Sequence, residues 1–220
     1  MKDNNQRKNL FDRWSETYNQ DVNHESFPLT GYDQALNAII ELADFHPDHT
    51  VLDLGVGTGN LAQRLPLPGD QIWGVDFSEK MLAKAKEAIP GAHLYQVDLR
   101  DQNWPPEMQQ PFDRIISGYT LHEFRDSLKQ EILIRLAADS LAVGGKIVIG
   151  DISFLDKAHF STVYHEFKET WDEEEYYWCA KPMTEALEAL GFSVQYQQIT
   201  FCAGIYVIVY NAPSPGDHTQ

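Results

Sequence analysis

The stretch that decides the fold is VLDLGVGTGN, residues 51–60, in which an apolar run leads through an acidic residue to three glycines at alternate positions. This order is typical of a buried strand that turns sharply into a helix. Glycine lets the backbone adopt a positive φ and approach a ligand closely, and free N–H groups at the helix start can bind that ligand. We therefore expect a ligand site here; the alternative is a glycine-rich turn that binds nothing.

Composition excludes several classes of function. The chain has 220 residues and a net charge of -16, which repels phosphate backbones and anionic membranes. No apolar segment approaches the roughly 18 residues of a membrane span, and no apolar run follows the basic N-terminus as in a secretory leader. The two cysteines, Cys179 and Cys202, lack metal-site spacing, so we expect free thiols and no metal. These features favour a cytoplasmic protein that binds neither nucleic acid nor membrane; we expect a monomer or homodimer.

Strand-like and helix-like segments alternate along most of the chain. Alternation of this kind implies right-handed crossovers and a parallel sheet covered by helices on both faces. The two final strands, joined by a short turn, form an antiparallel ending. We predict an α/β fold: a Rossmann-like, doubly wound, mostly parallel seven-stranded sheet with an antiparallel C-terminal strand. The expected strands are 50–54, 71–76, 92–97, 112–117, 146–152, 192–199 and 204–210, and the expected helices between them are 59–65, 78–89, 126–142 and 183–190.

Helices are also expected outside this alternation. Apolar residues at helical spacing predict a helix over 8–20 and a second one after Gly31, so that residues 1–46 form N-terminal helices over the ligand site at the end of the first strand. An aromatic stripe made of Phe160, Val163, Tyr164, Phe167, Trp171 and Trp178 predicts a helix over 158–178. We expect a single domain over 1–210, with an acidic helical insertion at 153–180 and a disordered tail at 211–220.

Acidic side chains follow the first three predicted strands. Asp53, Asp76 and Asp98 each stand at a strand's carboxyl end, which is where open α/β sheets bind their ligands. An acid after the second strand can accept hydrogen bonds from both hydroxyls of a ribose. Each of these carboxylates alone could be a helix cap or a solvated turn residue. Together with the glycine turn they predict a nucleoside site.

The glycine spacing bears on which nucleoside cofactor binds. A dinucleotide fingerprint has glycine at the first, third and sixth positions. Here the glycines are the first, third and fifth, Asn60 is the sixth, and Asp53 precedes the turn by two residues. A carboxylate beside a pyrophosphate would be repulsive, so a nicotinamide or flavin dinucleotide is disfavoured. A ligand that carries an ammonium group beside its nucleoside suits Asp53 better.

S-adenosyl-L-methionine has that combination, and five segments in order resemble the motifs of class I S-adenosylmethionine-dependent methyltransferases: 51–59, 74–78 with Met81, 97–99, 112–117 and 141–146. The resemblance implies that Asp76 binds the ribose, that Asp98 and Leu99 bind the adenine, and that Phe77 and Met81 pack on it. It also implies that the glycine turn holds the methionine moiety. The cofactor-binding candidates are Tyr18, Asp53, Gly55, Gly57, Thr58, Gly59, Asp76, Phe77, Met81, Asp98, Leu99 and Ser117.

Within this class the N-terminal segment resembles the small bacterial methyltransferases of the YrrT type. The similar residues are Phe11 to Trp14, Tyr18 and Gly31–Tyr32. Asn19 and Glu123 differ from the residues that group tends to have at these positions. The resemblance therefore implies an enzyme that methylates a small-molecule acceptor by in-line transfer. The alternatives are a cofactor-binding regulatory domain without transferase activity and a nicotinamide-dependent oxidoreductase.

The candidate acceptor residues follow from position. His122 comes directly after the fourth strand, so it is the candidate general base; the alternative is that it only hydrogen-bonds a loop or caps a helix. Tyr18 and Trp14 could cover the sulfonium with their rings, or simply belong to the core. Glu174 falls on the aromatic stripe as a pocket carboxylate for a cationic or hydroxyl-bearing acceptor, unless the helix frays near Asp172. The predicted substrate pocket is Trp14, Tyr32, Tyr119 and Glu174.

Overall fold

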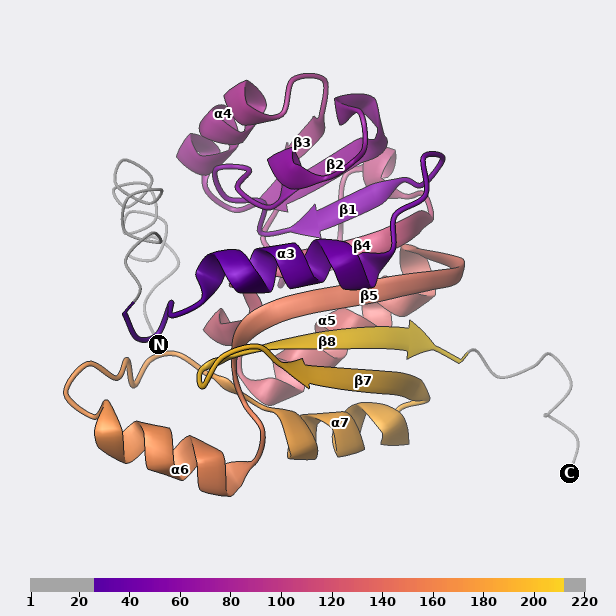
Figure 1. Cartoon of the computed structure of the whole chain (residues 1–220). Helices are drawn as coiled ribbons and strands as arrows, with labels where there is room; N and C mark the ends of the chain where they lie inside the picture. Colours follow the sequence, from indigo (N-terminus) through magenta and orange to yellow (C-terminus); the bar gives the residue numbers. More distant parts are fainter. Residues whose placement is uncertain (1–25, 212–220) are drawn as a thin grey trace, which may run out of the picture.

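The computed structural model describes residues 26–211, which form an α/β fold around one central sheet (Figure 1). Its strands lie in the order β3-β2-β1-β4-β5-β8-β7. β1 to β5 pair in parallel along this row, and β8 pairs antiparallel with both β5 and β7. The predicted fold class is confirmed. The strands are β1 Val51–Leu54, β2 Ile72–Asp76, β3 His93–Gln96, β4 Phe112–Gly118, β5 Leu141–Phe154, β7 Phe192–Gln198 and β8 Ala203–Tyr210.

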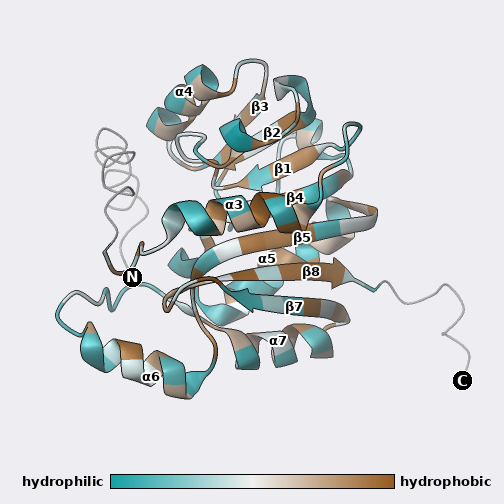
Figure 2. Ribbon diagram, in the orientation of Figure 1, coloured by the Kyte–Doolittle hydropathy of each residue, from teal (hydrophilic) through white to brown (hydrophobic). Residues whose placement is uncertain are grey.

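Helices cover both faces of the sheet. On one face α3 (Tyr32–Ala43) and α4 (Glu79–Ala88) pack over a core that includes Ile39, Val148 and Ile205. On the other face α5 (Asp126–Asp139) and α7 (Ala180–Ala189) pack over a core that includes Ile147 and Leu133. Successive residues of β5 thus enter opposite cores, as the alternation of side chains along a strand requires. Figure 2 shows the result, with β5 and β8 hydrophobic between helices whose outer surfaces are largely hydrophilic.

The helix boundaries follow local chemistry where the sequence supplied it. Ser78 caps α4, because its hydroxyl accepts a hydrogen bond from the Met81 N–H at 3.2 Å, and Gly91 follows the helix with φ 88°. The helix predicted at 59–65 is wrong: only η1, a single 3-10 turn at Ala62–Arg64, forms there. Leu65 is already extended, and the prolines at 66 and 68 cannot continue a helix. Three further 3-10 turns are η2 Gly69–Gln71, η3 Pro106–Met108 and η4 Leu121–Glu123.

The long helix predicted at 158–178 is also wrong, because α6 ends at Glu166 (Lys157–Glu166). The chain then turns, and the Asp172 side chain accepts the Glu174 N–H at 2.8 Å. This turn brings Trp171 back to stack on Phe154 with ring centroids 5.7 Å apart. Trp178 does not share that stripe: it lies in β6 (Trp178–Cys179), which pairs with β5 beside the main row, and belongs to the opposite core.

Some predictions fall outside residues 26–211. The expected helix at 8–20, with Trp14 and Tyr18, and the tail beyond residue 211 lie among the residues that the structure does not describe. Of the expected N-terminal cover, α3 is therefore the part that can be placed. Across the described residues, no helix has the length and apolar character needed to cross a membrane. Cys179 and Cys202 are both free thiols.

Candidate functional site

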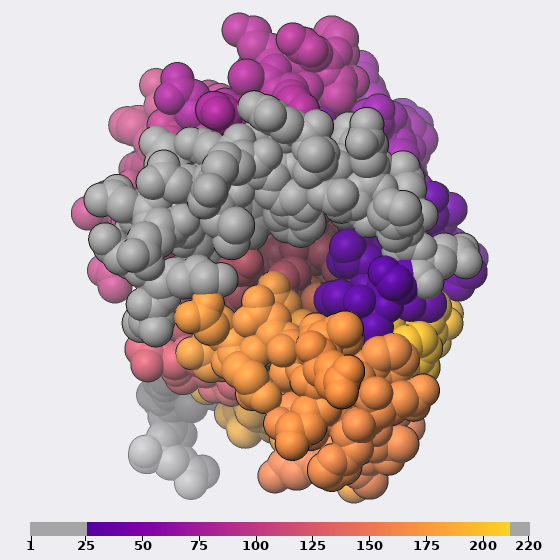
Figure 3. All heavy atoms as spheres, turned by 90° about the vertical axis from the view of Figure 1, so that its left-hand side faces the viewer, coloured from indigo at the N-terminus to yellow at the C-terminus, as the bar shows by residue number. Residues whose placement is uncertain are grey.

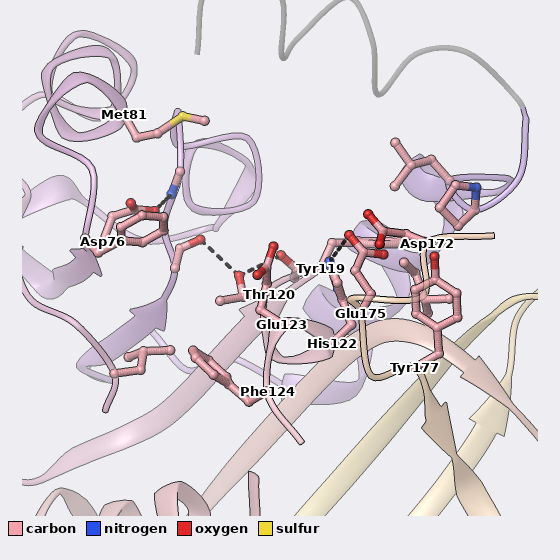
Figure 4. Close-up of a pocket in the computed structure, with 18 of the residues that line it drawn as sticks. Asp76, Met81, Tyr119, Thr120, His122, Glu123, Phe124, Asp172, Glu175 and Tyr177 are labelled. Carbon is pink, nitrogen blue, oxygen red and sulfur yellow. Dashed lines mark hydrogen bonds and ion pairs between the residues drawn. The ribbon is translucent and has the colours of Figure 1, made fainter. Parts of the chain in front are cut away.

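A cavity of about 290 Å³ lies at the carboxyl edge of the parallel strands. Its walls come from the loops after β1 to β4, from the residues that lead into α3, and from the segment 170–177. Figure 3 looks onto this edge, where the segment after β5, in orange, lies beside the indigo residues that precede α3. Figure 4 shows Asp76 and Met81 at one end of the cavity and His122, Glu175 and Tyr177 at the other. We call these the donor end and the acceptor end.

The glycine turn after β1 forms part of the donor end. Gly55 adopts φ 70°, and a Cβ placed on it would lie 2.3 Å from Thr120 Oγ1. Because L-residues strain at this φ and the space is already filled, only glycine fits. The next glycine of the turn, Gly57, donates its N–H to Asp76 Oδ2 at 3.0 Å. The turn is therefore held against the end of β2 by the same carboxylate that faces the cavity.

The two acidic residues at the donor end have different partners. Asp76 is nearly buried, and its second oxygen accepts the Ser78 N–H at 2.8 Å. Asp98 accepts from the backbone N–H of Arg100 at 3.0 Å and from its Nε at 2.8 Å. The hydrogen bond to Asp98 raises the pKa of the Arg100 guanidinium above its ordinary value. Asp76 is thus held by backbone donors, whereas Asp98 has a cationic partner.

Asp53 stands apart from both, in a second, smaller cavity of about 20 Å³. Its side chain is 1% exposed, and neither carboxyl oxygen has a hydrogen-bond partner within residues 26–211. Burial, together with the nearby charge of Asp76, raises its pKa to about 8. The small cavity shares Gly55, Gly57 and Gly118 with the main one. A buried carboxyl of this kind is adapted to a cationic group that arrives with a ligand.

His122 is the central residue of the acceptor end and lies in η4, directly after β4. Its Nδ1 is 2.6 Å from Asp151 Oδ1, and its Nε2 is 3.8 Å from Glu175 Oε1. Burial alone would lower the histidine's pKa, but the charge and hydrogen bond of Asp151, aided by Glu175 and Glu123, raise it to about 9. The imidazole is therefore protonated at neutral pH in the ligand-free protein, so it is not a free base there.

Comparison with known proteins identifies the family. Residues 51–145 match the model of a methyltransferase domain. An uncharacterized methyltransferase of Geobacillus kaustophilus is 34% identical over 201 residues, covering 86% of this chain and 90% of that protein. The chain belongs to the class I S-adenosylmethionine-dependent methyltransferases. A second relative, an uncharacterized methyltransferase of Geobacillus thermodenitrificans, is 33% identical over 202 residues and covers the same share of each chain.

Solved structures agree on the fold. DhpI in its complex with SAH superposes with a TM-score of 0.68 at 17% identity, over 94% of this chain and 96% of that one. The magnesium protoporphyrin IX methyltransferase of Synechocystis PCC 6803, also with bound SAH, gives a TM-score of 0.65 at 18% identity, over 93% and 100%. The cofactor of this methyltransferase is S-adenosylmethionine.

The donor end fits that cofactor on chemical grounds. Asp53 supplies a buried carboxyl without a partner among the described residues, which suits the ammonium of the methionine moiety. Gly118 lines both cavities, and a Cβ added there would come within 2.9 Å of Leu36, so glycine lets the end of β4 pack closely against α3. Asp76 presents a carboxylate that can accept from ribose hydroxyls.

The structure brings most of the predicted site residues together. Gly55, Gly57, Asp76, Phe77, Met81, Asp98, Leu99, Tyr119 and His122 line the main cavity, and Tyr32, Asp53 and Thr58 line the smaller one. The Tyr32 and Tyr119 rings also contact each other, with centroids 4.9 Å apart.

Three predicted residues line neither cavity. The Ser117 hydroxyl is fully buried and donates to the Leu54 carbonyl at 2.9 Å, so it holds β4 to β1. Gly59 packs against α4, where an added Cβ would lie 3.0 Å from Ile89 Cδ1. Glu174 is exposed, because the turn at Asp172 directs its neighbour Glu175 to the cavity instead.

Sequence reasoning missed the residue that organises the acceptor end. Asp151, at the carboxyl end of β5, is completely buried and accepts the His122 N–H at 2.9 Å and the Trp178 Nε1–H at 3.1 Å. Lys129 of α5, also fully buried, donates to the Tyr176 carbonyl at 2.5 Å. These contacts fix the segment 176–178 against the sheet. The one sequence signal for Asp151 was its place after an apolar strand, like Asp53 and Asp76. The other missed residues that line the cavity include Thr120, Glu123, Phe124, Asp172, Glu175 and Tyr177.

Proposed function

We propose that this enzyme methylates a small-molecule acceptor that enters the acceptor end of the main cavity. The observation that carries the proposal is that Asp76, His122 and Glu175 line one continuous cavity, so a methyl donor bound at Asp76 would face an acceptor bound at His122 and Glu175. The lining includes Pro28 and Leu29 on one side and Tyr177 on another. The net charge of -16 makes a nucleic-acid acceptor unfavourable.

For the cofactor we propose the roles implied by the sequence. Asp76 accepts from the ribose hydroxyls, and Asp98 and Leu99 contact the adenine. Phe77 and Met81 pack on the adenine ring, while the glycine turn and Asp53 hold the methionine moiety. Tyr18 and Trp14, outside the described residues, remain candidates for covering the sulfonium.

Transfer is proposed to be an in-line displacement in which the acceptor atom attacks the methyl carbon. S-adenosylmethionine supplies a methyl group on a sulfonium; the methyl–sulfur bond breaks, its electron pair stays on sulfur, and a neutral thioether, an excellent leaving group, departs. The protein can therefore act mainly by alignment, which is worth about 7 to 11 kcal/mol in well-oriented reactions. A pKa of about 9 argues against His122 as a general base at neutral pH. We propose instead that His122, held through Nδ1 by Asp151, helps to position the acceptor.

The test is methyl transfer itself. Incubation with methyl-labelled S-adenosylmethionine and a small-metabolite extract is expected to give a labelled small molecule, which mass spectrometry then identifies. Asp76→Asn should weaken cofactor binding about 100-fold and lower labelling with it, whereas Asp48→Asn, at a 91% exposed side chain, should change neither. Cofactor binding without any labelled product from extract, protein or RNA fractions would instead favour a regulatory binding domain. Label confined to macromolecules would refute the small-molecule acceptor.

A further inference from the structure

The acceptor end contains three potential metal ligands on two segments of the chain. His122 and Glu123 come from η4, and Glu175 comes from the turn before β6. One ligand atom from each lies within 4.8 Å of the others, and all three residues line the main cavity. Figure 4 shows their side chains converging there. The cluster thus combines an imidazole nitrogen with two carboxylates.

The imidazole is oriented as in metal sites. Nδ1 is engaged by Asp151 at 2.6 Å, which leaves Nε2 facing the cavity. Nε2 lies 3.8 Å from Glu175 Oε1, which is too long for a hydrogen bond. Metal-binding histidines almost always engage a carboxylate, carbonyl or water through their other nitrogen, which fixes the ring and its tautomer. Asp151, completely buried and bound also to the His122 N–H and to Trp178, is a rigid partner of this kind.

A further polar group lies on the same wall. The Tyr177 hydroxyl is buried near Glu175, and within the described part of the chain it forms no hydrogen bond of normal geometry. Asp172 adds another carboxylate to the cavity lining. Buried polar groups are normally paired, so a buried hydroxyl whose contact with Glu175 lacks hydrogen-bond geometry indicates that a ligand completes the set.

We propose that His122, Glu123 and Glu175 bind a divalent transition-metal ion, with Asp151 as the positioning residue. Bonds of about 2.0 to 2.2 Å from metal to nitrogen or oxygen place adjacent ligand atoms about 3 Å apart. The observed separation of 3.8 Å between Nε2 and Oε1 is within about 1 Å of that value. One nitrogen and two oxygen donors suit manganese, iron or zinc better than magnesium or calcium, which prefer oxygen alone.

Three protein ligands leave coordination positions open to the cavity. If the proposed function holds, the metal presents these positions to an acceptor that carries oxygen ligands, such as a hydroxyl beside a carboxylate or carbonyl. The site therefore selects acceptors by their oxygen atoms. The metal site itself does not depend on that function, because it can be measured with neither cofactor nor acceptor present.

The experiment is manganese binding to the full-length, chelator-treated protein, followed by electron paramagnetic resonance of free Mn²⁺ and by calorimetry. One equivalent is expected to bind. Glu175→Gln should weaken binding at least about 10-fold, because it removes a charged ligand. Glu174→Gln is the matched control: it removes the same charge one residue away, from an exposed side chain, and should bind as the parent does.

The site is overturned if the parent binds no manganese or zinc, or binds them no more tightly than Glu175→Gln. Glu123→Gln provides a second test from the other chain segment, should Glu175→Gln fold poorly. Equal loss in Glu174→Gln would also refute the site, since it would reflect general negative charge. Labelled product without metal binding would refute the metal site and leave the proposed function intact. Metal binding without labelled product would support the metal site and count against the proposed function.

Discussion

The donor end and the acceptor end of one cavity are built in different ways. At the donor end, Asp53, Asp76 and Asp98 each lie within two residues of the carboxyl end of a strand, and the Gly57 N–H of the glycine turn donates to the Asp76 carboxylate. At the acceptor end, His122 is placed by Asp151, 29 residues away, and Tyr176 by Lys129, 47 residues away. The donor end is thus built from the ends of successive strands, whereas the acceptor end depends on contacts between segments farther apart in the chain.

The ends also differ in how their buried charges respond to pH. Asp53, at the donor end, is an acid whose pKa is raised from 3.8 to about 8 by burial and by Asp76. His122, at the acceptor end, is a base whose pKa is raised from 6.5 to about 9, chiefly by Asp151, against the effect of burial. Both folded forms hold a proton that the unfolded chain releases at lower pH. Each residue therefore makes stability fall with rising pH, but in a different range.

The largest expected effect is at Asp53. Between pH 3.8 and about 8 the unfolded chain has lost this proton and the folded chain keeps it. The unfolding free energy of the parent then falls by about 1.4 kcal/mol per pH unit from this group. Asp53→Asn should remove this pH dependence. The unfolding free energy of Asp53→Asn minus that of the parent should therefore rise by up to about 4 kcal/mol from pH 5 to pH 8 and remain constant above pH 8.

Urea unfolding of the ligand-free protein across this pH range measures the difference. Asp48→Asn, which removes an exposed carboxylate, serves as the control for net charge. A constant difference between Asp53→Asn and the parent would show that Asp53 is paired in solution. Asp53→Asn should also weaken S-adenosylmethionine binding, so stability and cofactor affinity change in opposite directions.

The next effect is at His122. Its proton stabilises the fold fully below about pH 6.5, and this contribution is lost as the pH rises through about 9. His122→Asn should therefore be destabilising near neutral pH, with a deficit that shrinks by up to about 3.4 kcal/mol toward pH 10. The charges that face His122 are Asp151, Glu175 and Glu123. Urea unfolding in the presence of a chelator measures the difference in unfolding free energy between His122→Asn and the parent. His46→Asn, at an exposed histidine, is the control. A stability deficit of His122→Asn that grows above pH 9 would contradict the prediction.

The acids of the two ends show how far the sequence predicted the site. Asp53, Asp76 and Asp98 could be found because strand ends converge at one edge of a parallel sheet, so their position in the chain fixes their position in space. Asp151 also follows an apolar run, within β5, but its contacts with His122 and Trp178 depend on a loop path that no local pattern encodes. Glu175 was missed because helical spacing selected Glu174, and the turn at Asp172 ended that spacing.

A smaller effect is expected at Gly55. Alanine at position 55 would have φ near 70°, and its Cβ would lie 2.3 Å from Thr120 Oγ1. Thr120 also lines the main cavity. Strain and overpacking together should cost about 3 kcal/mol. Gly144→Ala is the matched control, with φ 79° and no atom within 4 Å of the added Cβ, and should cost about 1 kcal/mol. Chemical denaturation compares them; equal losses would mean that Thr120 moves aside without cost.

The smallest expected effect separates the two ends most directly. Glu175 lies at the acceptor end and contacts none of the proposed cofactor groups, so Glu175→Gln should change S-adenosylmethionine affinity less than about threefold, through screened long-range charge alone. Asp76→Asn, which alters hydrogen bonds to a charged acceptor, should cost about 100-fold. Calorimetric titration with S-adenosylmethionine compares both in metal-free buffer. A loss in Glu175→Gln as large as that in Asp76→Asn would place the cofactor across the whole cavity and leave no separate acceptor end.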